Sequence, residues 1–153
     1  MANPRDIRTA ALMLLFQLDA ELAASSDASA QLEAVDAAFE EEGASLSDSE
    51  RARASAMAHG AWKARRDTDT FIRQVAPEWP PHRMPAVDRA ILRLAIHEMT
   101  TGEHNPKIAV NEAIELAKKF STDRSPAFVN ALLDKALKQL LAARSTPEPS
   151  AEA

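Results

Sequence analysis

The stretch that decides the fold of this chain reads IAVNEAIELAKKF and occupies positions 108–120. An Asn-Pro dipeptide at 105–106 stands before it and is typical of a helix start. The asparagine side chain can accept a hydrogen bond from an otherwise unpaired backbone N–H, and proline lacks an N–H where none is needed. A Ser-Pro dipeptide at 125–126 predicts a second start by the same reasoning. We therefore expect two closing helices, over 106–120 and 126–143.

The N-terminal half also carries helix signals. A helix of about twenty residues is expected from Pro4, because apolar residues recur there at spacings of three and four and form one buried stripe. The residues of this stripe are Ile7, Ala11, Leu14, Leu15, Leu18 and Leu22. A weaker amphipathic pattern predicts a helix over 32–43. The capping box SDSE at 47–50 opens another helix, which we read as one long helix to Val75, with the polar stretch 65–70 as the place where a break could fall.

Prolines divide the chain. Four of them lie between positions 77 and 85 and interrupt any helix there, before a further helix expected over 85–101. The sequence thus predicts one all-α domain over 1–145, with an N-terminal subdomain 3–76 and a C-terminal subdomain 82–145. Residues 146–153 contain two prolines and no apolar residue beyond alanine, so we expect a disordered tail.

The charge of the chain is distributed unevenly. The net charge is −5, yet the span from Asp19 to Glu50 holds ten acidic residues and no basic one. From Arg51 to Arg144, sixteen Lys and Arg face ten Asp and Glu, which leaves +6. The larger, C-terminal part of the chain is therefore basic although the chain as a whole is acidic. There is no apolar run of 18 residues and no signal-peptide pattern, so we expect a cytoplasmic protein without a membrane span.

Catalytic and metal-binding signatures are missing. His97-Glu98 begins a zinc-protease pattern, but Thr101 stands where the second histidine would be needed. Glu112 and Glu115 share a helix face, but the di-iron pattern needs a histidine where Lys118 stands. The absence of cysteine and the presence of only three glycines remove thiol chemistry, Cys-ligated zinc and a glycine-rich phosphate loop. We predict no enzyme, no cofactor and no metal.

Three segments in order resemble the NusB family of transcription antitermination proteins. They are RTAAL at 8–12 continuing to Phe16, VDRAILRLAIHE at 87–98, and the opening stretch followed by FVNALLDK at 128–135. The resemblance implies about seven helices in two small packed bundles. It also implies a protein that binds boxA-type single-stranded RNA with ribosomal protein NusE, in a transcription elongation complex that supports ribosomal RNA transcription.

The resemblance also implies an RNA-binding surface. Its candidate residues are Arg5, Arg8 and Phe16 near the N-terminus, and Arg124, Ser125 and Phe128 near the start of the last helix. Apart from the resemblance, Lys118 and Lys119 are candidates for the same basic face, although solvated surface lysines fit the pattern better. Arginine neutralises phosphate and stacks on bases, an aromatic ring offers a stacking platform, and a helix N-terminus supplies N–H donors. We expect the two groups of residues to lie side by side and form one cationic patch. Phe128 fits RNA contact and core packing equally well.

Two alternatives remain open from the sequence. The segment from Arg5 to Arg8 holds two basic residues where family members often carry three or four in a row, so a protein-only interaction module is possible. The chain also resembles the NusB-like domain found fused to ribosomal RNA methyltransferases, and would then need a separate catalytic partner. Arg93, Glu98 and Asn111 are expected to bond neighbouring helices rather than a ligand.

Overall fold

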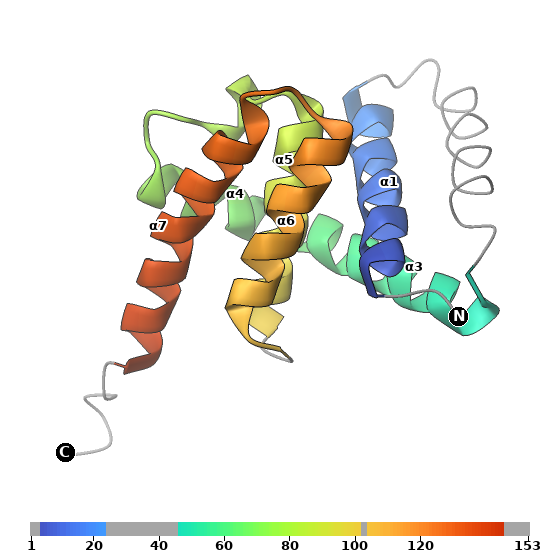
Figure 1. Ribbon diagram of the computed structural model, residues 1–153. Coiled ribbons are helices and arrows are strands. Elements are labelled where there is room, and N and C mark those ends of the chain that lie inside the picture. Colours follow the sequence, from blue (N-terminus) through green and yellow to red (C-terminus); the bar gives the residue numbers. More distant parts are fainter. Residues whose placement is uncertain (1–3, 24–45, 102–103, 146–153) are drawn as a thin grey trace.

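The computed structural model describes residues 4–23, 46–101 and 104–145, and this part of the chain is helical throughout, with short connections (Figure 1). The elements in chain order are α1 (Pro4–Ala23), α3 (Asp48–Lys63), α4 (Arg65–Val75), the 3-10 helix η1 (Pro81–Arg83), α5 (Ala86–Thr101), α6 (Pro106–Phe120) and α7 (Ser125–Ser145). The predicted all-α class is confirmed. The expected helix over 32–43 and the expected tail 146–153 lie outside the described residues.

The helix starts follow the capping signals in the sequence. Glu50 N–H donates to the Ser47 hydroxyl (3.2 Å), and Ser47 N–H donates to the Glu50 carboxylate (2.9 Å), which completes the capping box of α3. At α6, Lys107 N–H donates to the Asn105 side chain (3.0 Å), with proline at the first helical position. Local polar chemistry therefore sets both starts.

The break between α3 and α4 falls at Ala64, one residue before the polar stretch 65–70, which is itself helical. The expected long helix is thus two helices, and the break lies just before the polar stretch rather than within it. The Arg65 guanidinium donates to the Trp62 carbonyl (2.9 Å) and also lies over the Trp62 ring, 3.9 Å from its centroid. The carbonyl released at the end of α3 is thus satisfied by the first side chain of α4.

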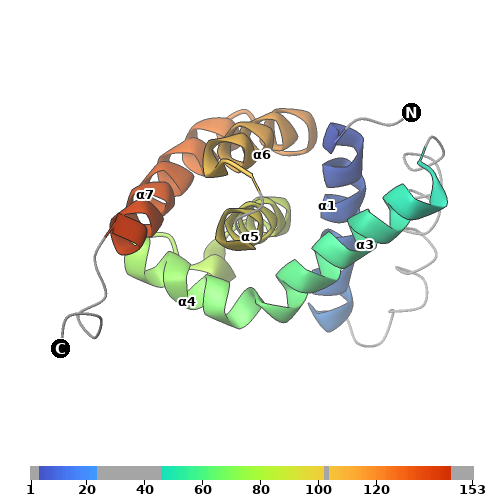
Figure 2. The same ribbon diagram turned by 90° about the horizontal axis from the view of Figure 1, so that it is seen from below.

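Helix α5 occupies the centre of the molecule, with the other long helices around it (Figure 2). It packs against α1, α3, α4, α6 and α7. Most of the helix surface is apolar and buried, and the buried apolar residues of α5 include Ala90, Ile91, Leu92, Leu94, Ala95, Ile96 and Met99. Because α5 contacts helices on both sides of the proline segment, the predicted subdomain limits 3–76 and 82–145 stay a prediction.

Ion pairs join α5 to its neighbours. Arg93 donates to Asp69 of α4 (2.7 and 3.0 Å) and to Asp19 of α1 (3.3 Å), and Arg89 also donates to Asp19 (3.0 Å). The expectation that Arg93 bonds neighbouring helices is confirmed. Asn111 was expected to do the same, but its side chain is exposed on α6.

The close approach of α3 and α5 depends on a glycine. A Cβ atom at Gly60 would lie only 2.6 Å from the Nε2 atom of His97. Together with the buried alanines of α3 (Ala54, Ala58 and Ala61), Gly60 lets the two helices approach closely, with the His97 ring against the α3 backbone.

Candidate nucleic-acid interface

The start of α7 is fixed to the start of α5 by a buried carboxylate. Asp88, in the first turn of α5, is 3% exposed and accepts hydrogen bonds from Ser121 Oγ (2.6 Å) and Ser125 Oγ (3.0 Å). The Ser125 hydroxyl also lies 2.8 Å from that of Ser121 and 2.9 Å from that of Thr122. The positive end of the α5 dipole favours the carboxylate at this place. Asp88 therefore sets the geometry of the α6–α7 turn.

Two aromatic rings stand beside this network. Trp79 and Phe128 meet edge to face, with ring centroids 5.3 Å apart and planes at 85°. Lys135 Nζ lies 5.5 Å from the Trp79 ring centroid and forms an ion pair with Glu78 at 3.5 Å. Trp79 is 37% exposed, whereas Phe128 is partly buried against the core. The Phe128 ring is thus packed against the core, while the Trp79 ring presents an accessible surface.

These residues surround a pocket of about 290 Å³, which we name the α7-start pocket. Its walls are Glu78, Trp79, Pro80, Arg83, Met84, Pro85, Asp88, Thr122, Arg124, Ser125 and Phe128. Within the described part of the chain, the guanidinium groups of Arg83 and Arg124 have no ion-pair partner. The pocket thus combines aromatic surface with two available cations, a combination that suits a base and its phosphates.

Three further predicted residues lie toward the same end of the molecule. Lys118 and Lys119 are exposed in the last turn of α6, directly before the turn that leads into α7. Lys118 pairs with Glu115 (3.2 Å), and Lys119 Nζ lies 5.1 Å from the Phe120 ring centroid. Phe16, partly buried on α1, precedes by one turn the Asp19 that bonds the start of α5.

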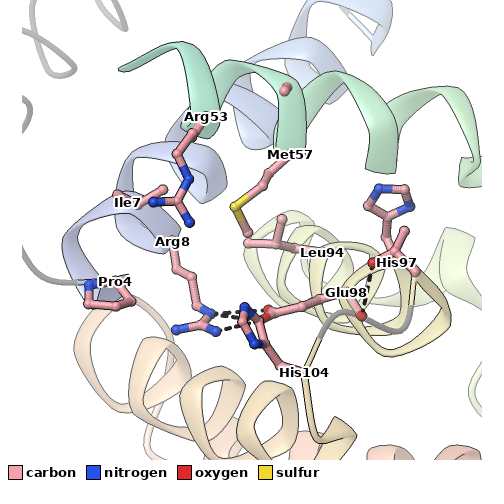
Figure 3. A pocket seen from close by; sticks show the side chains of 11 residues that line it. Pro4, Ile7, Arg8, Arg53, Met57, Leu94, His97, Glu98 and His104 are labelled. Carbon is pink, nitrogen blue, oxygen red and sulfur yellow. Dashed lines mark hydrogen bonds and ion pairs between the residues drawn. The ribbon is translucent and has the colours of Figure 1, made fainter. Parts of the chain in front are cut away.

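The other two predicted residues lie at the opposite end. Arg8 donates to both carboxylate oxygens of Glu98 (3.0 and 3.1 Å; Figure 3), and Arg5 donates to Glu112 (2.9 and 3.2 Å). Glu98 follows Asp88 by ten residues on α5, which corresponds to about 15 Å along the helix axis. The expectation that Arg5 and Arg8 form one patch with the start of α7 was therefore wrong.

The cause of this separation is helix direction. The first half of α1 meets the end of α5 through Arg8, and Asp19 in its second half meets the start of α5 through Arg89, so α1 and α5 are antiparallel (Figure 1). Helix α7 begins where α5 begins. The start of α1 must then lie away from the start of α7.

Burial and pairing change how these arginines can act. Arg8 is 8% exposed, and its hydrogen bonds to Glu98 raise its pKa. The Arg5 side chain is 58% exposed, and its hydrogen bond to Glu112 lowers the pKa of that carboxyl group. Arg8 is thus part of the helix packing, whereas Arg5 remains accessible from solvent.

Sequence reasoning missed three residues of the α7-start pocket as functional candidates: Trp79, Arg83 and Asp88. The signal for Asp88 was available, because an acidic residue in the first turn of an otherwise apolar helix needs a partner. Trp79 and Arg83 lie in the proline segment 77–85, where no helical periodicity predicts which way a side chain points.

Comparison with known proteins identifies the family. The sequence model of the NusB family matches residues 5–138. The chain belongs to the NusB family. The resemblance seen in the sequence is therefore confirmed.

Curated relatives and solved structures agree with this assignment. The transcription antitermination protein NusB of Chloroflexus aggregans is 35% identical over 150 residues, covering 93% of this chain and 91% of that protein. The NusB protein of Symbiobacterium thermophilum is 38% identical over 147 residues, covering 94% and 95%. The solved structure of T. maritima NusB has a TM-score of 0.71 at 30% identity, covering 90% of this chain and 93% of its own.

A more distant structure shares the fold alone. The antitermination factors NusB and NusE in complex with double-stranded RNA include a chain that aligns with a TM-score of 0.70 at 20% identity.

Among the described residues of the present chain, no group of three or more potential ligands could hold a metal ion. No helix in the described part of the chain is both long enough and apolar enough to cross a bilayer.

Proposed function

We propose that this chain is a transcription antitermination factor. It binds boxA-type single-stranded RNA together with ribosomal protein NusE, and acts within the transcription elongation complex to promote ribosomal RNA transcription. The observation that carries the proposal is the NusB family match over residues 5–138, with relatives of nearly equal length that are named antitermination proteins. This activity requires no catalytic residue and no cofactor.

The α7-start pocket is the part of the surface that best suits the RNA. An unpaired base can stack on the accessible face of Trp79, whose edge contact with Phe128 holds the ring in place. The guanidinium groups of Arg83 and Arg124 can then neutralise the flanking phosphates. Lys119 adds positive charge at the end of α6, whereas Lys118 is paired with Glu115, and Phe16 on α1 is not one of the residues that line the pocket.

Ser125, Arg5 and Arg8 have different roles in this proposal. Ser125 positions the start of α7 through Asp88 and is too buried to meet RNA. Arg5 can exchange Glu112 for a phosphate at modest cost, because exposed ion pairs contribute about 0–1 kcal/mol. If Arg8 bound a phosphate instead, the largely buried Glu98 carboxylate would lose its partner, so we assign Arg8 to the stability of the fold.

A titration tests the proposal. Labelled boxA-type RNA of twelve nucleotides is titrated at low salt, with and without NusE, against the native chain, an R124A/F128A variant and the control Lys138→Ala. Lys138 lies on α7 with its side chain 76% exposed and, among the described residues, forms an ion pair only with Asp134 of the same helix, so the control removes a cation outside the pocket.

The double variant is expected to bind at least tenfold more weakly, because the Trp79 ring loses the edge contact that holds it for stacking, and stacking contributes about 1–3 kcal/mol per base. Its salt slope is expected to fall by about 0.7, the value for one phosphate contact on a single strand. The control should match the native chain. Unchanged affinity in the double variant would remove the pocket from the mechanism, and absence of RNA binding with and without NusE would favour a protein-only module.

A further inference from the structure

The hydrogen bonds on one wall of the α7-start pocket have a defined direction. Ser121, Thr122 and Ser125 place three hydroxyl groups near Asp88, and the four side chains form one connected network. Asp88 and Ser125 are 3% and 2% exposed, whereas Thr122 is exposed and lines the pocket. Thr122 therefore carries the hydroxyl group of this network that a base in the pocket can meet.

The direction follows from counting protons. Each hydroxyl group has one proton to donate, and a carboxylate has none. Asp88 is the charged acceptor of the network, so it takes the protons of Ser121 (2.6 Å) and Ser125 (3.0 Å). The Ser125 oxygen lies 2.9 Å from the Thr122 oxygen and has no proton left for it. The hydrogen bond between these two oxygens must then run from Thr122 to Ser125.

The Thr122 oxygen is thus left as an acceptor. Its proton is used by Ser125, so only its lone pairs remain for a ligand. The two cations of the pocket, Arg83 and Arg124, are exposed and have no ion-pair partner among the described residues, which suits them to phosphates. The buried network and the exposed cations therefore meet different parts of a nucleotide, the base and the backbone.

We infer that the α7-start pocket selects an unpaired base that carries an exocyclic amino group, and that Thr122 determines this preference. The inference rests on the RNA-binding function proposed above. A cytosine stacked on Trp79 donates from its N4 amino group to the Thr122 oxygen. Uracil has a carbonyl oxygen at that position of the ring, so two acceptors face each other and both stay unpaired.

The experiment measures the binding of two labelled oligonucleotides of twelve residues, one of cytidine and one of uridine, at low salt and neutral pH with NusE present. They carry the same charge, and every register places the same base in the pocket. Thr122→Val keeps the shape of the side chain and removes the hydroxyl group, whereas Thr122→Ser keeps that group. Thr70→Val is the matched control, because Thr70 is exposed on α4 outside the pocket and its hydroxyl donates to the Arg66 carbonyl (2.9 Å).

The native chain is expected to bind the cytidine oligonucleotide about tenfold more tightly, because the uridine oligonucleotide loses a hydrogen bond and leaves acceptors unpaired. Thr122→Val should bring the two affinities within about twofold of each other, since no acceptor remains to distinguish the bases. Thr122→Ser and Thr70→Val should keep the native ratio. A purely structural effect of Thr122→Val would weaken both oligonucleotides equally and leave the ratio unchanged.

The remaining results overturn the inference. Equal binding of the two oligonucleotides by the native chain, or a preference that persists in Thr122→Val, would show that Thr122 does not select the base. A native preference for the uridine oligonucleotide would contradict the direction assigned to the Thr122 hydroxyl. Absence of binding by the cytidine oligonucleotide would also overturn the inference, and the proposed RNA-binding function would fail with it only if boxA-type RNA did not bind either.

Discussion

Removal of the Arg8 side chain tests whether this arginine holds the fold together or meets the RNA. The Arg8 and Glu98 side chains are 10% and 14% exposed, and they join the first half of α1 to the end of α5. Removing one partner of a buried ion pair costs about 3–5 kcal/mol, because the remaining charge has no compensation. Since both side chains keep slight solvent contact, we expect Arg8→Ala to lower the free energy of unfolding by about 2–4 kcal/mol.

The assay is urea unfolding followed by far-UV circular dichroism. With a slope of about 1.5 kcal/mol/M, a loss of about 3 kcal/mol lowers the midpoint by about 2 M. Lys138→Ala is the matched control, because it breaks an ion pair whose side chains are 76% and 55% exposed. Such a pair contributes about 0–1 kcal/mol, so its midpoint should change little.

A double variant isolates the pair itself. Replacing both Arg8 and Glu98 by methionine fills similar space without leaving a lone charge, and we expect it to lie within about 1 kcal/mol of the native chain. If Arg8→Ala is no less stable than the Lys138 control, the buried pair does not hold the helices. If the double variant retains native RNA affinity while folded, Arg8 makes no essential contact with RNA.

Three further predictions concern stability. Burial lowers the pKa of His97 in the folded chain, so the unfolded chain binds a proton on this histidine at a higher pH than the folded chain does. The contribution of neutral His97 to the free energy of unfolding is therefore complete above the ordinary pKa of about 6.5 and is lost as the pH falls through the folded-state pKa. His97→Leu should flatten a urea pH series below pH 7, while the exposed His59→Gln should not. Ser47→Ala removes the α3 cap and should cost about 1 kcal/mol in urea unfolding; no loss would refute the role of the capping box. Ser125→Ala takes one of two hydroxyl donors from buried Asp88 and should cost about 1–3 kcal/mol by thermal unfolding, and an unchanged midpoint would show that the network is dispensable.

Local chemistry made the helices predictable from the sequence. The capping box at Ser47 and the Asn105 cap act within three residues, so both starts could be read directly. The apolar stripe of α1 was also predictable, since Ile7, Ala11 and Leu15 are buried as its spacing requires.

The arrangement of the site could not be read in the same way. Whether the start of α1 lies near the start of α7 depends on the antiparallel packing of α1 on α5, and no spacing within either helix encodes that direction. The family resemblance supplied candidate residues for one RNA-binding surface, but it did not place them side by side. Asn111 shows the same limit, because an interior helix position does not tell which face the side chain takes.

The arginines of the chain fall into two classes that composition cannot separate. Arg8, Arg89 and Arg93 pair with carboxylates on other helices and orient the bundle around α5. Arg53 and Arg124 lack such partners within the described residues and lie at opposite ends of the molecule. A paired arginine adds nothing to the charge that a ligand meets, so the net charge of −5 predicts little about binding at either end.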